Sequence, residues 1–247
     1  MSGKITAANS ASATGTIVQV GTNANLTGNI DVNGNVVVGG GTVSGKVTHP
    51  TGTTYTGPAP AGGNIIGAPS LPTLPALPTP IVFPAASSTN VTTNQTLAPG
   101  NYGALTLSGN KTVTLNGAGI YVFSAVTLSN SNNLVFNFQN SSTGQFRIYV
   151  HGDIDFGKLN ASMANGGSAD RIYLEVHGNG STSASGKDAI KISNGSSGGS
   201  GSSKWMGSIY APYGTINISA GTGSTLLTGA LWSGTQLNIQ SGVSLVF

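Results

Sequence analysis

Apolar and polar residues alternate along much of the chain, a pattern typical of β-strands with one buried face and one polar face. The stretch FRIYVHGDIDF places Phe146, Ile148 and Val150 on one side, and DRIYLEVHG does the same with Ile172 and Leu174. Both stretches open on Arg-Ile-Tyr, twenty-four residues apart. That spacing is plausible for one coil of a β-solenoid, in which equivalent strands stack. We therefore predict two stacked, half-buried strands.

A second pattern, in which a glycine lies between two apolar positions, recurs in both halves of the chain. A small residue flanked by inward apolar residues fits the tight inside of a stacked coil. Chance is the alternative in a chain with 38 glycines. The four copies are Leu26-x-Gly28-x-Ile30, Val43-x-Gly45-x-Val47, Trp205-x-Gly207-x-Ile209 and Leu227-x-Gly229-x-Leu231.

The outward positions of the predicted strands carry mainly hydroxyl and amide groups. Stacked Asn and Gln side chains can form amide ladders along such a face. A flat, ordered hydroxyl array is also what recognition of ice or of a glycan requires. We predict a ligand face of this kind from six residues: Thr106, Thr112, Thr114, Thr127, Thr215 and Asn217.

Proline content divides the chain into parts. Most of the eleven prolines lie in GPAPAGGNIIGAPSLPTLPALPTPIVFPAA, and this density favours extended polyproline II over a hydrogen-bonded ladder. Its leucines and Phe83 make it more apolar than a free linker, so we expect it to pack along the outside of the solenoid. We predict N-terminal coils at 1–57 that form the first coils of the stack, a Pro-rich connector at 58–86 and a main body at 87–247. The Gly/Ser-rich insert 178–204 predicts a mobile loop.

Composition narrows the classes of function. Charged residues make up 6% of the chain, against about 25% in an ordinary soluble domain. Ser, Thr, Asn and Gly must therefore provide solubility, and they disfavour long helices. The nine cations are scattered rather than clustered, which predicts no nucleic-acid binding. The absence of cysteine excludes disulfides and zinc-thiolate sites.

The sequence also bears on location. No stretch approaches the roughly 18 apolar residues of a membrane helix, so we expect no membrane insertion. The opening MSGKITAANSASATG carries no apolar signal core. Low charge, no cysteine and abundant Asn, Ser and Thr suit a secreted or cell-surface bacterial protein. We expect such a location, with the export signal already removed.

Three stretches resemble a known family: LAPGNYGALTLSGNKTVTLNGAGIYVF, FRIYVHGDIDF and the segment from WMGSIYAPYG to the end. They are similar to β-helical domains of bacterial surface and pilus-associated proteins and to the ice-binding adhesin fold, a discontinuous right-handed β-solenoid. The resemblance implies an all-β, right-handed parallel β-solenoid (β-helix) with almost no helix; a β-sandwich is the alternative. The matching positions are turn and core positions in those families: Pro99, Gly100, Tyr102, Tyr210, Ala211 and Pro212.

The outward residues of the two Arg-Ile-Tyr stretches are the main candidates for chemistry. Carboxylates and imidazoles on one rigid face can bind a hard or borderline cation, or act as acid and base. An electrostatic ladder on a solvent-facing sheet, in which Arg and His side chains compensate the carboxylates, is the alternative. Apart from a possible Ca²⁺ we expect no cofactor. The candidate cation ligands are His151, Asp153, Asp155, Glu175 and His177.

The function that we expect is non-enzymatic: an extracellular structural or adhesive protein. The final strand GVSLVF is followed by no charge or proline, and solenoid ends expose unpaired backbone groups. We therefore predict head-to-tail stacking into a fibre through Gly242, Val243, Leu245 and Phe247. The alternatives are an ice- or glycan-binding module, for which Trp205, Trp232, Tyr210 and Tyr213 could supply an aromatic platform, and a polysaccharide lyase that uses Asp153, Asp155, Asp170 and Arg171.

Overall fold

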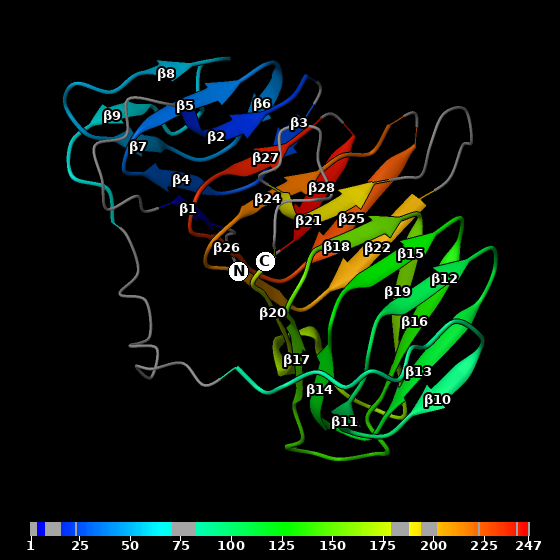
Figure 1. The fold of residues 1–247 in the computed structure, drawn as a ribbon. Coiled ribbons are helices and arrows are strands. Elements are labelled where there is room, and N and C mark those ends of the chain that lie inside the picture. The colour runs from blue at the N-terminus through cyan, green and yellow to red at the C-terminus, as the bar shows by residue number, and fades with distance from the viewer. Residues whose placement is uncertain are drawn as a thin grey trace.

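The computed structural model describes residues 4–7, 16–22, 24–70, 83–178, 188–193, 202–221, 223–240 and 242–246. These residues form three long sheets of stacked strands (Figure 1). The strand pairings are all parallel. The fold is therefore a parallel β-solenoid, as predicted, and a β-sandwich of antiparallel strands is excluded. Within the described part of the chain, no helix is long and apolar enough to cross a membrane.

Each coil of the main body contributes one strand to each of the three sheets. The seven-stranded sheet contains, in spatial order, β10 (Gln95–Leu97), β13 (Thr112–Asn116), β16 (Asn132–Asn137), β19 (Leu159–Ala164), β22 (Ser202–Met206), β25 (Ser224–Thr228) and β28 (Val243–Val246). The six-stranded sheet contains β11 (Gly100–Asn101), β14 (Gly119–Phe123), β17 (Phe146–Val150), β20 (Ile172–Val176), β23 (Ser208–Ala211) and β26 (Leu231–Ser233). A 3-10 turn, η1 (Ala169–Arg171), precedes β20.

The nine-stranded sheet joins the main body to the N-terminal part of the chain. Its strands from the body are β12 (Leu105–Ser108), β15 (Val126–Ser129), β18 (Ile154–Gly157), β21 (Asp188–Ser193), β24 (Thr215–Ile218) and β27 (Leu237–Ile239). The sheet continues with β2 (Thr16–Val20), β5 (Asn35–Val38) and β8 (Tyr55–Thr56). Smaller sheets contain β1 (Lys4–Ala7), β4 (Asn29–Val32), β7 (Val47–His49) and β9 (Asn64–Ile66), and β3 (Ala24–Leu26) with β6 (Gly41–Val43).

The N-terminal coils therefore lie at the opposite end of the stack from the predicted one. Val18 on β2 pairs with Leu237 on β27, so the N-terminal coils continue the stack where the last complete coil of the body ends (Figure 1). The first coil of the body is instead bordered by Val91, which bridges to Leu105. Physically, β2 and β27 both present buried apolar residues at matching positions, and each supplies the other with a strand partner.

This arrangement corrects the prediction that the last coil is uncapped. β28 pairs with β25 and lies beside β3, and the neighbouring β27 is covered by β2. Val243 is buried, Leu245 packs against the core and Gly242 is exposed; Phe247 lies outside the described residues. The outer edge of β27 is thus paired within the same molecule, whereas β28 is the last hydrogen-bonded strand of its sheet and has β3 only as a neighbour.

The glycine pattern marks places where successive coils stack closely. Leu26 pairs with Val43, and Trp205 pairs with Leu227, so the copies lie directly over one another. A Cβ at Gly45 would lie 2.1 Å from the carbonyl oxygen of Gly28, and one at Gly229 would lie 2.3 Å from that of Gly207. No side chain fits at such distances, which explains the repeated glycine.

Aromatic side chains fill the centre of the main body. Trp205 is 1% exposed and stacks on Phe156 with ring centroids 5.5 Å apart. Phe136 meets Trp205 edge-on at 6.0 Å and Phe146 at 5.3 Å. The three phenylalanines come from the consecutive strands β16, β17 and β18, one in each sheet, and Trp205 lies on β22, two strands from β16, so the rings tie coils together along the axis.

Two predicted segments differ in detail from the structure. The insert 178–204 contains β21, which pairs with β18 and β24; its flanks, 179–187 and 194–201, lie outside the described residues. The alternation of Ile190 and Ile192 with Lys191 is a strand pattern that the surrounding Gly and Ser obscured. Of the Pro-rich connector predicted at 58–86, Asn64–Ile66 instead forms the strand β9, which pairs with β7 in a hydrogen-bonded ladder. Residues 71–82 lie outside the described residues, while Phe83 and Pro84 contact the solenoid.

Candidate functional site

One continuous row of outward side chains crosses the whole nine-stranded sheet. Each member is the Cα partner of the next, so neighbours are separated by the strand spacing of about 4.8 Å and the row extends about 38 Å. The alternate residues of the same strands are buried in the core. We call this the outer row: Thr106, Thr127, Asp155, Lys191, Asn217, Asn238, Gln19, Val37 and Thr56.

The six residues of the predicted ligand face do not share one surface. Thr106, Thr127 and Asn217 belong to the outer row. Thr215 lies on the same sheet but is 3% exposed, and its hydroxyl lies 3.1 Å from that of Thr235. Thr112 and Thr114 lie on β13 in the seven-stranded sheet. The predicted ligand face is therefore divided between two sheets. The outer row also contains residues that were not predicted as part of that face: Asp155, Lys191, Asn238, Gln19, Val37 and Thr56.

Amide ladders form on the seven-stranded sheet. The Asn133 side-chain amide donates to the Thr112 hydroxyl at 3.3 Å, and Asn160 donates to the Asn133 oxygen at 3.1 Å. A second ladder runs from Asn165 through Asn137 to Asn116, at 2.8 and 2.7 Å. These ladders hold the polar side chains in fixed positions on adjacent coils.

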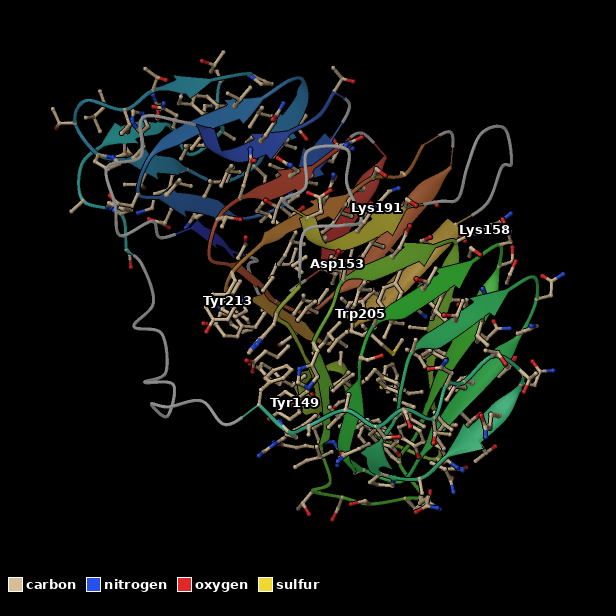
Figure 2. The ribbon with its side chains drawn as sticks, viewed as in Figure 1. Tyr149, Asp153, Lys158, Lys191, Trp205 and Tyr213 are labelled. Atoms are coloured by element: carbon tan, nitrogen blue, oxygen red, sulfur yellow. The ribbon has the colours of Figure 1, made fainter. Side chains whose placement is uncertain are left out.

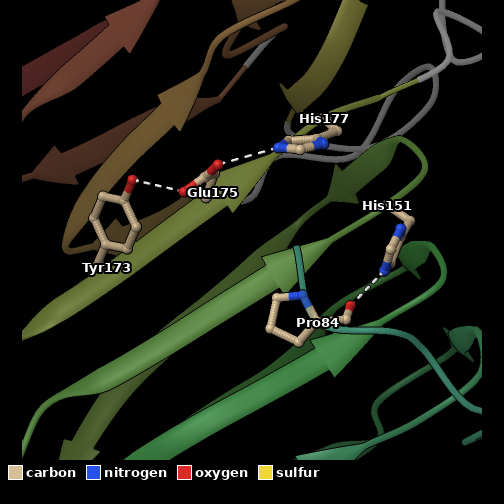
Figure 3. A network of polar contacts seen from close by, with 5 residues as sticks. All are labelled: Pro84, His151, Tyr173, Glu175 and His177. Atoms are coloured by element: carbon tan, nitrogen blue, oxygen red, sulfur yellow. Dashed lines mark hydrogen bonds and ion pairs between the residues drawn. The ribbon is translucent and has the colours of Figure 1, made fainter. Parts of the chain in front are cut away.

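The predicted cation ligands are distributed over several contacts, and two of them meet in a network on the six-stranded sheet (Figure 3). Glu175 is 4% exposed, and its carboxylate accepts the Tyr173 hydroxyl at 3.0 Å and lies 3.1 Å from His177 Nε2. His151 makes a separate contact, with Nε2 2.7 Å from the Pro84 carbonyl oxygen. Phe83 stacks on His177 with ring centroids 3.6 Å apart. The imidazoles thus hold the end of the connector.

The carboxylates of Asp153 and Asp155 do not join this network into a metal centre. Asp153 is buried in the turn before β18, and Asp155 lies in the outer row beside Thr127 and Lys191. Among the described residues no three His, Asp or Glu side chains are grouped closely enough to hold a metal ion. Calcium binding therefore remains a prediction from the sequence, with no cluster to support it.

The two Arg-Ile-Tyr stretches stack, but with a shifted register. Arg147 pairs with Tyr173, and Tyr149 pairs with Glu175, so Arg171 falls before the strand in η1. There its guanidinium donates to the Ser141 carbonyl at 3.0 Å and lies 4.5 Å from the Phe138 ring centroid. Arg171 therefore holds the loop after β16. A polysaccharide lyase would need this side chain as its base, and here it is engaged in other contacts.

Several tyrosines near Glu175 resist ionisation. Burial raises the pKa of Tyr173, and the carboxylate of Glu175 raises it further. The pKa values of Tyr149 and Tyr210 are raised by burial first and then by Glu175. Because Tyr149, Glu175 and Tyr210 are successive Cα partners on β17, β20 and β23, one carboxylate acts on three phenols.

These shifts predict a loss of stability in alkali. Above about pH 10 the unfolded chain releases phenolic protons that the folded chain retains, so the free energy of unfolding falls as pH rises. Glu175→Gln should lower the pKa of Tyr173 toward its ordinary value, as followed by phenolate absorbance. Asp170→Asn, at an exposed carboxylate on η1, is the control; equal titration of the two variants would contradict this account.

The predicted aromatic platform is only partly formed. Trp205 is buried in the core and donates its indole N–H to the Gly207 carbonyl at 3.1 Å. Tyr210 pairs with Trp232 on the neighbouring strand, and Tyr213 is 65% exposed and meets His177 edge-on at 5.0 Å. Figure 2 shows Trp205 between the sheets and Tyr149 and Tyr213 along the outside of the body.

Comparison with known proteins gives one match. A family model described as "Putative Ice-binding-like adhesive domain" matches residues 2–238. No curated protein and no solved structure gives a significant match. The family match covers nearly the whole described solenoid, including both the N-terminal coils and the main body.

Proposed function

The chain belongs to the ice-binding-like adhesive domain family, and from this we propose that it is a non-catalytic adhesive module of an extracellular bacterial surface. Its low charge and lack of cysteine suit that location. The family description names adhesion and no reaction. The proposal therefore assigns binding, and not turnover, to the protein.

The outer row is the observation that carries this proposal. Eight of its nine members, all except Val37, present hydrogen-bonding side chains at a constant spacing on a rigid sheet, and an extended, regular target can match that spacing over many contacts at once. Adhesion needs such repetition because each single contact at an exposed site is weak. The row also joins parts that are far apart in the sequence. Gln19, Val37 and Thr56, from the N-terminal coils, follow Asn238 in the series that begins at Thr106.

The chemistry of the row favours a hydroxylated polymer over ice as the target. Ice recognition needs a uniform hydroxyl array, and here Asp155 and Lys191 interrupt the series between Thr127 and Asn217. Charged and amide groups bind the hydroxyl groups of a glycan as donors and acceptors. We therefore propose a glycan surface as the target of the row.

Replacing Thr127 by tyrosine tests this proposal. The residue is exposed within the outer row, so a large ring there should lift an extended ligand off the sheet and weaken binding to an insoluble neutral polysaccharide at least tenfold. Thr96→Tyr, at an exposed position on the seven-stranded sheet, is the matched control and should bind as the parent does. Equal loss in both variants, or thermal hysteresis of the parent protein without glycan binding, would contradict the glycan assignment.

Self-association is a second candidate function, through a different end from the predicted one. β9 is an edge strand of its sheet, and Ile65 and Ile66 on it are 44% and 65% exposed. An edge strand with exposed apolar residues is a site for pairing with a second copy. Light scattering over a range of concentrations should show association that Ile66→Lys abolishes; a parent that stays monomeric throughout removes this candidate.

A further inference from the structure

The structure contains a shallow hollow on the outer face of the six-stranded sheet, apart from the outer row. Its volume is about 350 Å³, within the size range of ligand sites. Ala118, Gly119 and Ile120 line it from the start of β14, and Thr143, Gly144, Gln145 and Arg147 line it from the loop and strand that follow β16. The hollow is open to solvent, which suits one unit of a longer polymer better than an enclosed small molecule.

The walls of the hollow are held in place by named contacts. The Gly119 N–H donates to the Gln145 carbonyl at 2.9 Å, and the Gly144 N–H donates to the Ser141 hydroxyl at 2.9 Å. The Arg171 guanidinium also donates a hydrogen bond to the Ser141 carbonyl oxygen of the same loop. A Cβ on Gly144 would lie 2.6 Å from the Ala118 Cβ, so the loop rests directly on the strand beneath it. The hollow is therefore formed before any ligand binds, which reduces the entropic cost of binding.

The charge in the hollow comes from Arg147. Its side chain is exposed, and its guanidinium makes a long contact of 3.4 Å between Nη2 and the neutral side-chain oxygen of Gln145. A guanidinium has five N–H donors in a planar fork that matches a carboxylate. One contact to an amide leaves most of those donors for a ligand.

The rest of the surface suits a sugar ring beside that cation. Ile120, the Cα partner of Arg147 on β14, is 45% exposed and offers an apolar patch to the C–H face of a pyranose. Gln145 and Thr143 supply polar groups for ring hydroxyls. On the other side of Arg147 its Cα partner is Tyr173, so an aromatic ring borders the cation away from the hollow.

From this arrangement we propose that the hollow binds a carboxylated sugar unit of an acidic polysaccharide, with the carboxylate on the Arg147 guanidinium and the ring over Ile120. The site goes beyond the proposed glycan adhesion by the outer row: it lies on another sheet, and it selects for negative charge. A protein that uses both surfaces would hold neutral polymer on one side and acidic polymer on the other.

The experiment measures binding of oligogalacturonate by calorimetry to the full chain, with neutral galacto-oligosaccharide as the reference ligand. Arg147→Gln should weaken oligogalacturonate binding at least tenfold, Arg147→Lys should weaken it less, and added salt should weaken binding by the parent. Lys46→Gln removes the same charge from an exposed position on the N-terminal coils and should bind within twofold of the parent.

Three results would overturn the proposal: no binding of oligogalacturonate by the parent, equal weakening by Arg147→Gln and Lys46→Gln, or equally tight binding of dextran sulfate and oligogalacturonate. The second would indicate general charge attraction, and the third an anion site without preference for carboxylated sugars. Thermal unfolding of each variant checks that the fold is intact. Neutral-polysaccharide binding by the Thr127→Tyr variant reports on the outer row alone, so failure of either proposal is separately visible.

Discussion

Changing Val18 to aspartate is expected to detach the N-terminal coils, weakening their attachment to the body by about 4 kcal/mol. Val18 is fully buried between Leu237 on β27 and Val36 on β5. A carboxylate at this position would have to enter an apolar core without a partner, or β2 would have to leave the sheet. Hydrogen exchange measures the result: amides of β2 and β5 should exchange about a thousandfold faster, since each 1.4 kcal/mol is a factor of ten.

Gln19→Asp is the control for this prediction because it places the same charge one residue along, on the exposed face of the same strand. Its exchange should match that of the parent within a few-fold. The body should keep its own protection in the Val18 variant, since its six coils pack on one another without β2. Equal exchange in the two variants would show that β2 is not seated on β27.

Replacing Gly229 by alanine is expected to lower the free energy of unfolding by about 3 kcal/mol or more. Gly229 has a φ of +141°, and a Cβ there would lie 2.3 Å from the Gly207 carbonyl oxygen. The turn between β25 and β26 would have to move away from the turn that contains Gly207. This movement separates β26 from β23 and loosens the packing of Leu231 on Ile209. Chemical denaturation followed by tryptophan fluorescence measures the change, because Trp205 and Trp232 flank this corner in the two coils.

Gly67→Ala is the matched control. A Cβ at Gly67 meets no atom within 4 Å, and its φ is not in the left-handed region. Its unfolding free energy should stay within about 0.5 kcal/mol of the parent. A Gly229 variant as stable as the Gly67 variant would mean that the coils can separate at the corner without loss of packing.

The stacked-coil fold could be predicted from the sequence because its signals are local and repeated. Alternation identified inward residues such as Phe146 and Ile148, and the glycine pattern identified positions where coils lie on one another. This glycine pattern occurs in both the N-terminal and the C-terminal parts of the chain. Its recurrence indicated that the two parts belong to one stack. Pairing of Val18 with Leu237 joins opposite ends of the chain, and no local spacing specifies it.

The candidate site was harder to predict because side chains on a solenoid acquire neighbours from other coils. Register depends on coil length, and the turn η1 displaced Arg171 from the strand, so Arg147 faces Tyr173. Thr215 alternates like its neighbours, yet it is buried. The outer row depends on β21, which the sequence hides in a Gly/Ser-rich insert, and the hollow depends on a loop whose shape Arg171 fixes from a later coil.

At the junction, strands from the beginning of the chain follow strands from its end, which gives the solenoid a circularly permuted strand order. Strands from the beginning of the chain, β1 and β2, lie beside β26 and β27, while β28 from its end lies beside β3. A rearranged gene in which residues 83–246 preceded residues 4–70 would trace the stack in one direction. In the natural order, a ribosome makes the N-terminal coils first, and they must wait for β27 before they can dock. We therefore expect their docking to be a nonlocal step that follows assembly of the body.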